Sequence, residues 1–115
     1  MKPQKELLQT ILEIGHLTSI RGEGISLKDV LSRVGYANIR DKFTYLDLIP
    51  LIQANQDLIN QWIYYSEDKR TSSGWYILKD GIIGRLEPKY KIVLNPIEAA
   101  VAEYVVLELD FWAGI

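Results

Sequence analysis

The 115-residue chain contains no cysteine and a single histidine, His16. The missing cysteines exclude disulfides, thiol nucleophiles and thiolate metal sites, and they suit a reducing cytosol. One histidine cannot build a multi-histidine metal centre, and alone it gives no support for a Ser/His/Asp arrangement. A phosphate-binding glycine loop is also missing, because Gly22-Glu23-Gly24 has no strand before it. We therefore expect a protein that is not an enzyme and uses neither a metal nor a cofactor.

Long apolar runs are missing as well. No stretch approaches the roughly 18 residues that a membrane-spanning helix needs. The first residues, Met-Lys-Pro-Gln-Lys-Glu, lead into an amphipathic pattern and not into the apolar block of a signal peptide. With 48% hydrophobic residues, the chain can fill one core of ordinary size. We expect a single domain over residues 1–115 that is soluble and cytoplasmic.

The chain also lacks an excess of positive charge. Its formal net charge is −2, which argues against a nucleic-acid partner because phosphate binding needs a concentrated basic surface. Residues 92–115 contain four acidic residues and no Lys or Arg, so the excess of negative charge lies on the last predicted helix and the rest of the chain has a net charge of +2. The acidic residues of this segment are Glu98, Glu103, Glu108 and Asp110.

The apolar spacing and capping residues of the first half of the chain predict a series of helices. Apolar residues at helical spacing predict an amphipathic helix over residues 4–19. Ser26 opens a second, short helix, which Gly35 closes through a left-handed position. Pro50 forbids one smooth helix through residues 36–54, so we expect a turn and then a short helix that begins near Pro50.

A further helix is predicted after Asn55, which can cap it. Tyr64 is expected to point away from the buried side of this helix. The residues expected on the buried side are Leu58, Ile59, Trp62, Ile63 and Tyr65.

Two short apolar runs joined by Asp80-Gly81 predict a β-hairpin with a two-residue turn. That register places Tyr76 opposite Arg85 and Ile77 opposite Gly84, and directly paired residues share a face. One face, suited to the core, then holds Trp75, Ile77 and Leu86. The other face holds Tyr76, Leu78, Ile83 and Arg85. Because its composition is that of an interface patch, we expect this face to bind a partner or to be covered by another helix.

The alternating segment KYKIVL predicts a third strand. Asn95 is expected to cap the last helix, with Pro96 at its first position and Glu98 reaching back to the cap. The helix should end near Trp112. The order of elements predicts an α+β fold: N-terminal helices, a three-stranded antiparallel β-meander, and a long C-terminal helix packed on the sheet.

Glu108 lies in the middle of the apolar arc of this last helix, one turn after Tyr104 and one turn before Trp112. A carboxylate there needs a cation or a hydrogen-bond donor, so we predict that Glu108 is at least half buried and has a partner. Its role is either structural or that of a binding-site carboxylate.

The opposite arc of the last helix is apolar too and is rimmed by acidic residues. This stripe indicates a contact with another chain or with the first helix. Its apolar members are Ala99, Ala102, Val106 and Leu109.

The segment YYSEDKRTSSGWY, residues 64–76, brackets a charged run with aromatic residues. The simplest interpretation is a solvated helix end and a turn before the hairpin. The alternative is a recognition loop, since loops on rigid scaffolds often carry function. Its candidate partner-binding residues are Tyr64, Glu67, Asp68, Lys69 and Arg70.

Residues 72–112, with SSGWYI, an alternating strand and LNPIEAAVAEYVVLELDFW, resemble small uncharacterised bacterial proteins of the toxin–immunity type. Together with the missing catalytic chemistry, this favours a non-catalytic protein-binding module that acts as an immunity- or antitoxin-like inhibitor. An acidic helix could enter the basic active site of a nuclease toxin by charge complementarity. The candidate partner-binding residues outside the loop are Tyr76, Arg85, Glu98 and Glu103.

Other functions stay open. The segment ISLKDVLSRVGYANIRDKFTYLDLIPLIQ has the short, closely spaced helices of a helix-turn-helix. In a DNA-binding regulator of this kind, Arg33, Arg40 and Lys42 would contact DNA phosphates, and the hairpin would be a wing. The chain could instead associate with itself or bind a small ligand. A small enzyme that uses Glu108 with Tyr76 or Arg85 would need a closed pocket.

Overall fold

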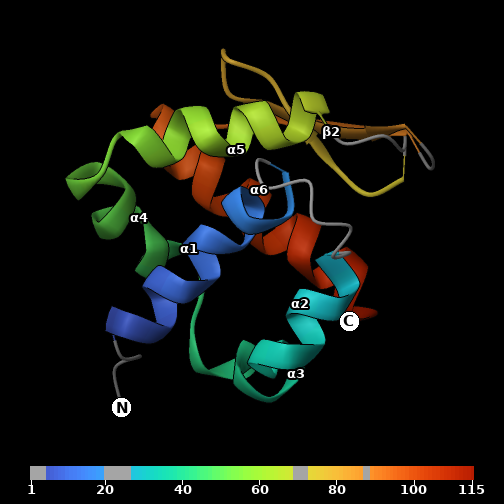
Figure 1. Cartoon of the computed structure of the whole chain (residues 1–115). Coiled ribbons are helices and arrows are strands. Elements are labelled where there is room, and N and C mark those ends of the chain that lie inside the picture. Colours follow the sequence, from blue (N-terminus) through green and yellow to red (C-terminus); the bar gives the residue numbers. More distant parts are fainter. Residues whose placement is uncertain (1–4, 20–26, 69–72, 87–88) are drawn as a thin grey trace.

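The computed structural model describes residues 5–19, 27–68, 73–86 and 89–115 (Figure 1). It confirms the α+β class, with a three-stranded antiparallel sheet of order β1-β2-β3 and a C-terminal helix packed on it. Among the residues used in the predictions, Gly22, Glu23, Gly24, Ser26, Lys69 and Arg70 lie outside the described residues, as do the side chains of His16 and Asp68.

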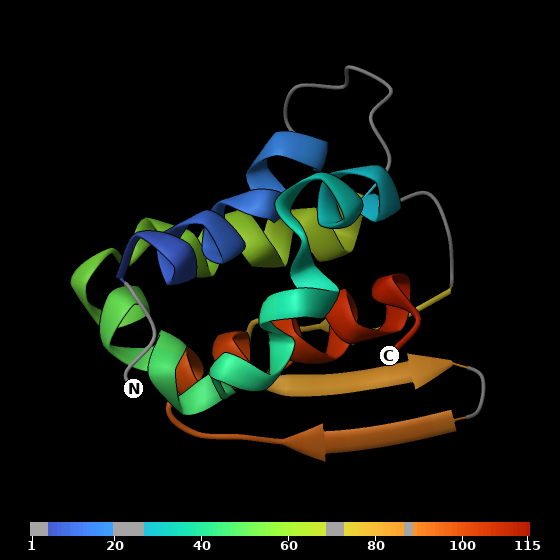
Figure 2. The ribbon, with the colours of Figure 1, turned by 90° about the horizontal axis from the view of Figure 1, so that it is seen from below.

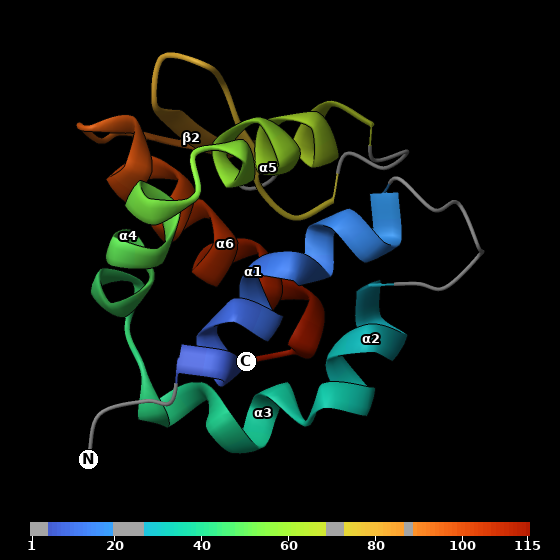
Figure 3. The same cartoon turned by 60° about the vertical axis from the view of Figure 1, so that its left-hand side comes forward.

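The C-terminal helix α6 (Ile97–Ala113) runs through the middle of the molecule (Figures 1 and 3). The other helices are α1 (Lys5–Ser19), α2 (Leu27–Val34), α3 (Tyr36–Ile39), the short 3-10 helix η1 (Arg40–Lys42), α4 (Tyr45–Ala54) and α5 (Asp57–Asp68). Helices α2, α4 and α5 pack directly on α6, and α1 packs on α5. None of the helices in the described part of the chain is both long and apolar enough to cross a bilayer.

The prediction that Pro50 ends a turn and starts a short helix is wrong. Helix α4 begins five residues earlier, at Tyr45, and passes through Pro50. Its start is fixed by a capping box, in which the side chains of Thr44 and Asp47 each accept a backbone N–H of the other residue. Pro50 removes the donor to the carbonyl of Leu46, but both residues lie on the exposed side of the helix. Water can satisfy that carbonyl there, so burial of Leu48 and Ile52 on the opposite side decides the conformation.

Two further helical predictions are confirmed over the described residues, the end of α2 and the buried side of α5. Gly35 follows α2 with a left-handed φ of 68° and donates its N–H to the carbonyl of Ser32. On α5, Tyr64 is 50% exposed. The predicted buried side of α5 is buried in full: Leu58, Ile59, Trp62, Ile63 and Tyr65.

The sheet consists of β1 (Tyr76–Ile77), β2 (Ile82–Leu86) and β3 (Lys89–Val93). The predicted register of the first hairpin is wrong by one residue, because Tyr76 pairs with Gly84 and Ile77 pairs with Ile83. The turn has three residues, Lys79 to Gly81, and is closed by a hydrogen bond from the N–H of Leu78 to the carbonyl of Ile82.

This shift moves every side chain of β2 to the other face of the sheet. Ile83 is fully buried under α6, whereas Leu86, predicted in the core, is 63% exposed. Arg85 therefore lies on the inner face with Trp75, and Tyr76 lies on the outer face.

The three-residue turn depends on Gly81, whose φ is 87°. A Cβ atom at this position would lie 2.5 Å from the carbonyl oxygen of Leu94, which follows β3. We expect Gly81→Ala to lower the free energy of unfolding by about 3 kcal/mol, from left-handed strain and from displacement of the neighbouring strand. Urea unfolding followed by circular dichroism measures this loss.

Gly114 offers a matched control, since its φ is 77° but a Cβ atom there would meet nothing within 4 Å. Gly114→Ala should therefore cost only the left-handed strain, about 1 kcal/mol. An equal loss in the two variants would contradict the steric role of the Leu94 carbonyl.

The start of α6 lies one residue later than predicted. Pro96, not Asn95, is the N-cap, because its ψ of 178° is extended, and its carbonyl accepts the N–H groups of Ala99 and Ala100. Helix α6 ends at Ala113, one residue beyond the predicted Trp112.

Candidate functional site

Glu108, in the second half of α6, has no exposed surface. The hydroxyl of Tyr65 donates to its Oε2 at 2.7 Å, and the backbone N–H of Trp75 donates to its Oε1 at 2.7 Å. The prediction of a buried Glu108 with a partner is thus confirmed. One turn earlier on α6, the hydroxyl of Tyr104 donates to the carbonyl oxygen of Trp75 at 3.1 Å. Two side chains of α6 therefore hold both backbone polar groups of Trp75, just before β1 begins.

The side chain of Trp75 belongs to a group that we call the aromatic–arginine cluster: Trp75, Arg85, Tyr90, Phe111 and Trp112. The guanidinium carbon of Arg85 lies 5.2 Å from the ring centroid of Trp75 and 5.4 Å from that of Phe111. The Trp75 and Tyr90 rings meet edge to face at 5.7 Å, and those of Phe111 and Trp112 do so at 5.1 Å. All five residues are partly or largely exposed. Trp, Tyr and Arg are the residues that most often dominate binding energy at protein interfaces.

This cluster differs from the patch predicted from the hairpin. The register shift separates Tyr76 from Arg85, which lie on opposite faces of the sheet. On the outer face, the Tyr76 ring covers Gly84, where a Cβ atom would lie 2.5 Å from the Tyr76 hydroxyl. The helical pattern placed Trp112 on the apolar arc of the last helix and predicted no binding role for it. The signal that this prediction missed was an aromatic pair in the last turn of a helix, where burial by neighbouring elements ends.

The acidic residues of α6 face other parts of the same chain. Asp110 accepts hydrogen bonds from the Tyr36 hydroxyl and from Nε of Arg40, both at 2.7 Å. Burial raises the pKa of Glu103, and the nearby charge of Arg40 opposes that shift. Glu98 is partly exposed and accepts a hydrogen bond from the Gln56 amide at 3.4 Å. The structure therefore presents no continuous acidic face along the described α6.

The apolar stripe of α6 is largely buried within the chain, where α2, α4 and α5 pack on this helix. Ala102 and Leu109 have no exposed surface, and Val106 is 5% exposed. The prediction that this stripe contacts another chain is therefore wrong for Ala102, Val106 and Leu109, which are buried within the chain itself.

The candidate loop residues are only partly described. Tyr64 and Glu67 are exposed on α5, and Asp68 is the last residue of that helix. The end of α5 is tied to the sheet, because the Ser66 hydroxyl accepts the backbone N–H of Ile77 at 3.0 Å.

The segment that resembles a helix-turn-helix does not form a recognition helix of the usual kind. Its second helix, α3, has four residues, and the following α4 carries no Lys or Arg. Arg40 pairs with Asp110, which leaves Arg33 and Lys42 exposed. No group of three or more His, Cys, Asp or Glu side chains within the described ranges could hold a metal ion.

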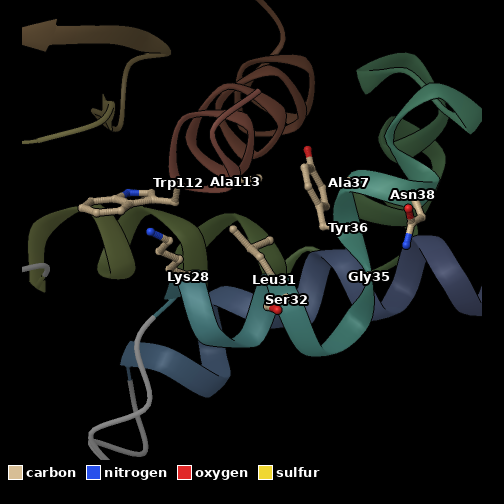
Figure 4. A pocket seen from close by; sticks show the side chains of 9 residues that line it. All are labelled: Lys28, Leu31, Ser32, Gly35, Tyr36, Ala37, Asn38, Trp112 and Ala113. Carbon is tan, nitrogen blue, oxygen red and sulfur yellow. The ribbon is translucent and has the colours of Figure 1, made fainter.

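A hollow of about 360 Å³ lies between α2, α3 and the last turn of α6 (Figure 4). Its lining residues are Lys28, Leu31, Ser32, Gly35, Tyr36, Ala37, Asn38, Trp112 and Ala113. Trp112 and Lys28 lie at one end of the hollow and Asn38 at the other (Figure 4). Because Trp112 belongs to both features, the hollow and the aromatic–arginine cluster share one wall.

The chain matches no protein-family model, and searches of curated proteins and of solved structures found no match to it. The resemblance to toxin–immunity proteins therefore stays a prediction.

Proposed function

We propose that this protein is a non-catalytic binding module for another protein and that the aromatic–arginine cluster is the centre of its contact surface. The observation that carries the proposal is the stacking of Arg85 between the Trp75 and Phe111 rings at a partly exposed site. Clustered aromatic and arginine side chains of this kind supply most of the binding energy in many interfaces.

The cluster is also held in place before any partner arrives. Glu108 and Tyr104 fix the backbone of Trp75, and the two rings restrict Arg85. A surface that is already ordered loses little conformational entropy on binding, so more of the contact energy appears as affinity. The hollow beside Trp112 can accommodate an apolar side chain of the partner.

The charge near the cluster indicates the kind of partner. Strands β2 and β3 carry Arg85, Lys89 and Lys91 and no acidic residue. An acidic protein surface with apolar anchors would complement this charge, and it would associate faster at low salt. In the inhibitor form of the proposal, the aromatic–arginine cluster and the lysines of β3 contact the toxin, and Glu98 and Glu103 act within the fold.

Tyr90 and Tyr64 provide a matched pair of variants, since they are 51% and 50% exposed and only Tyr90 belongs to the cluster. We expect Tyr90→Ala to weaken partner binding by about 2 kcal/mol, roughly 30-fold in Kd, as for other interface hot spots. Tyr64→Ala should leave binding within about twofold, as for a surface residue outside the interface. Tagged wild type and both variants are used to capture partners from lysate of the producing cells, at low and high salt, with mass spectrometry as the readout.

The expected result is one dominant protein that wild type and Tyr64→Ala retain, that Tyr90→Ala loses, and that high salt releases. Equal capture by both variants would contradict the assignment of the surface. Loss in Tyr64→Ala alone would favour the segment 64–76 as the contact. Melting curves of both variants verify that the fold is intact.

A further inference from the structure

Strand β3 forms a free edge of the described sheet. It pairs only with β2 in that part of the chain and lies at the margin of the sheet (Figure 2). Four of its five residues are exposed. The N–H of Leu94 bonds the carbonyl of Gly81, and the direction of such bonds alternates along a strand. The backbone groups of Tyr90 and Ile92 therefore face β2, whereas those of Lys89, Lys91 and Val93 point away from the sheet.

The side chains of this edge divide into two chemically different rows. Lys89, Lys91 and Val93 lie on the outer face, and the described strands place no carboxylate beside them. Tyr90 and the partly buried Ile92 lie on the inner face, next to Trp75. Residues that pair directly across two strands share a face, so an added strand would meet lysines on one side and apolar groups on the other.

Two of the antiparallel registers by which a second copy of this chain could pair with that edge are unfavourable. Antiparallel self-pairing centred on Lys91 places Lys91 opposite itself, and self-pairing centred on Tyr90 places Lys89 opposite Lys91. Either arrangement brings like charges together, and lysines on edge strands commonly prevent such association.

From this edge we propose that β3 accepts an extended segment of the partner protein in which acidic residues alternate with apolar ones. The acidic side chains pair with Lys89 and Lys91, and the apolar side chains extend the surface formed by Tyr90 and Ile92. Adding a strand to an exposed edge is a common way to bind extended peptides. The inference rests on the proposed protein-binding function and names the chemistry of the partner.

The test uses a blocked synthetic peptide of about nine residues that alternates Glu with Val. Binding to the full chain is followed by nuclear magnetic resonance and amide hydrogen exchange. We expect the exchange of the Lys91 amide and of its outward-facing neighbours to slow about tenfold or more, with little change at Tyr90 and Ile92, which already bond β2.

Two controls separate strand addition from simple charge attraction. N-methylation of the peptide at its Glu positions removes the edge hydrogen bonds, keeps the charge and should abolish binding, whereas N-methylation at Val should not. The double variant Lys89→Glu and Lys91→Glu should no longer bind the peptide that alternates Glu with Val, and it should bind a peptide that alternates Lys with Val instead.

Several outcomes would overturn the inference: no binding to the folded chain, binding that survives N-methylation at Glu, or a dimer in which Lys91 is already protected. If Tyr90→Ala still abolishes partner capture, the proposed function stands although strand addition is wrong. If neither the peptide nor a partner depends on Tyr90, Lys89 or Lys91, both proposals are wrong.

Discussion

Glu108→Ala is expected to lower the free energy of unfolding by about 4 kcal/mol. The substitution removes the acceptor of two hydrogen bonds of 2.7 Å and leaves the Tyr65 hydroxyl and the Trp75 N–H buried without it. A hydrogen bond to a charged group contributes about 1.5–3 kcal/mol, and a buried donor without an acceptor adds a further cost. Urea unfolding followed by tryptophan fluorescence measures the loss.

Two variants make this prediction specific. Glu108→Gln keeps the volume and one carbonyl oxygen, so it should lose about 2 kcal/mol, half the effect of alanine. Glu103→Ala removes a partly exposed glutamate from the same helix and should lose less than about 1 kcal/mol. If Glu108→Ala costs no more than Glu103→Ala, the anchoring role of Glu108 is wrong.

The same variants connect the core to the proposed binding surface. Loss of the hydrogen bond from the Trp75 N–H makes the backbone at Trp75 less rigid, and this backbone positions the Trp75 ring against Arg85 and Tyr90. Glu108→Gln should therefore alter the near-ultraviolet circular dichroism of the cluster while the chain is still folded. An unchanged spectrum would show that the Tyr104 hydroxyl alone holds Trp75.

The burial of Glu108 could be predicted from sequence because its neighbours at positions 104 and 112 fix its direction on the helix. Its partners could not, since Tyr65 and Trp75 are 43 and 33 residues away along the chain. Helical periodicity reports which side is buried, and only the packing of separate elements decides what lies there.

The hairpin shows how a small local choice changes the predicted site. The pair Asp80-Gly81 fits a two-residue turn, but Gly81 also supplies the left-handed residue that ends a three-residue turn. A shift of one residue in the register moves Arg85 from the sheet face that holds Tyr76 to the face that holds Trp75. The aromatic–arginine cluster could therefore not be assembled from sequence, although Arg85 was identified.

Stability is expected to fall steeply above pH 10, with a slope that approaches about 4 kcal/mol for each pH unit once the unfolded tyrosines are fully ionised. Burial raises the pKa of Tyr36, Tyr65 and Tyr104 well above the ordinary value of a tyrosine. Asp110 adds to the shift of the Tyr36 pKa, and Glu108 adds to those of the Tyr65 and Tyr104 pKa values. Each carboxylate accepts a hydrogen bond from a tyrosine hydroxyl or lies near one, and its negative charge disfavours ionisation of that tyrosine.

The sign follows from the direction of these shifts. Below pH 10 the three phenols keep their protons in both the folded and the unfolded chain, so their contribution to stability is fully present. Above pH 10 the unfolded chain loses protons that the folded chain still holds, and each tyrosine then lowers stability by about 1.4 kcal/mol per pH unit. Urea unfolding at a series of pH values from 9 to 11 gives the slope.

Single substitutions assign the slope to particular residues. Tyr65→Phe and Tyr104→Phe should each reduce it by about a third, and the double variant should leave only the contribution of Tyr36. Each variant also loses a hydrogen bond, but that loss lowers stability equally at every pH below 10 and does not change the slope. A slope that is the same in wild type and in the double variant would mean that both phenols ionise within the folded chain. In that case Tyr65 and Tyr104 would be accessible to water in the folded chain. The inference that Glu108 and Tyr104 hold Trp75 rigidly, on which the proposed interface depends, would then also be wrong.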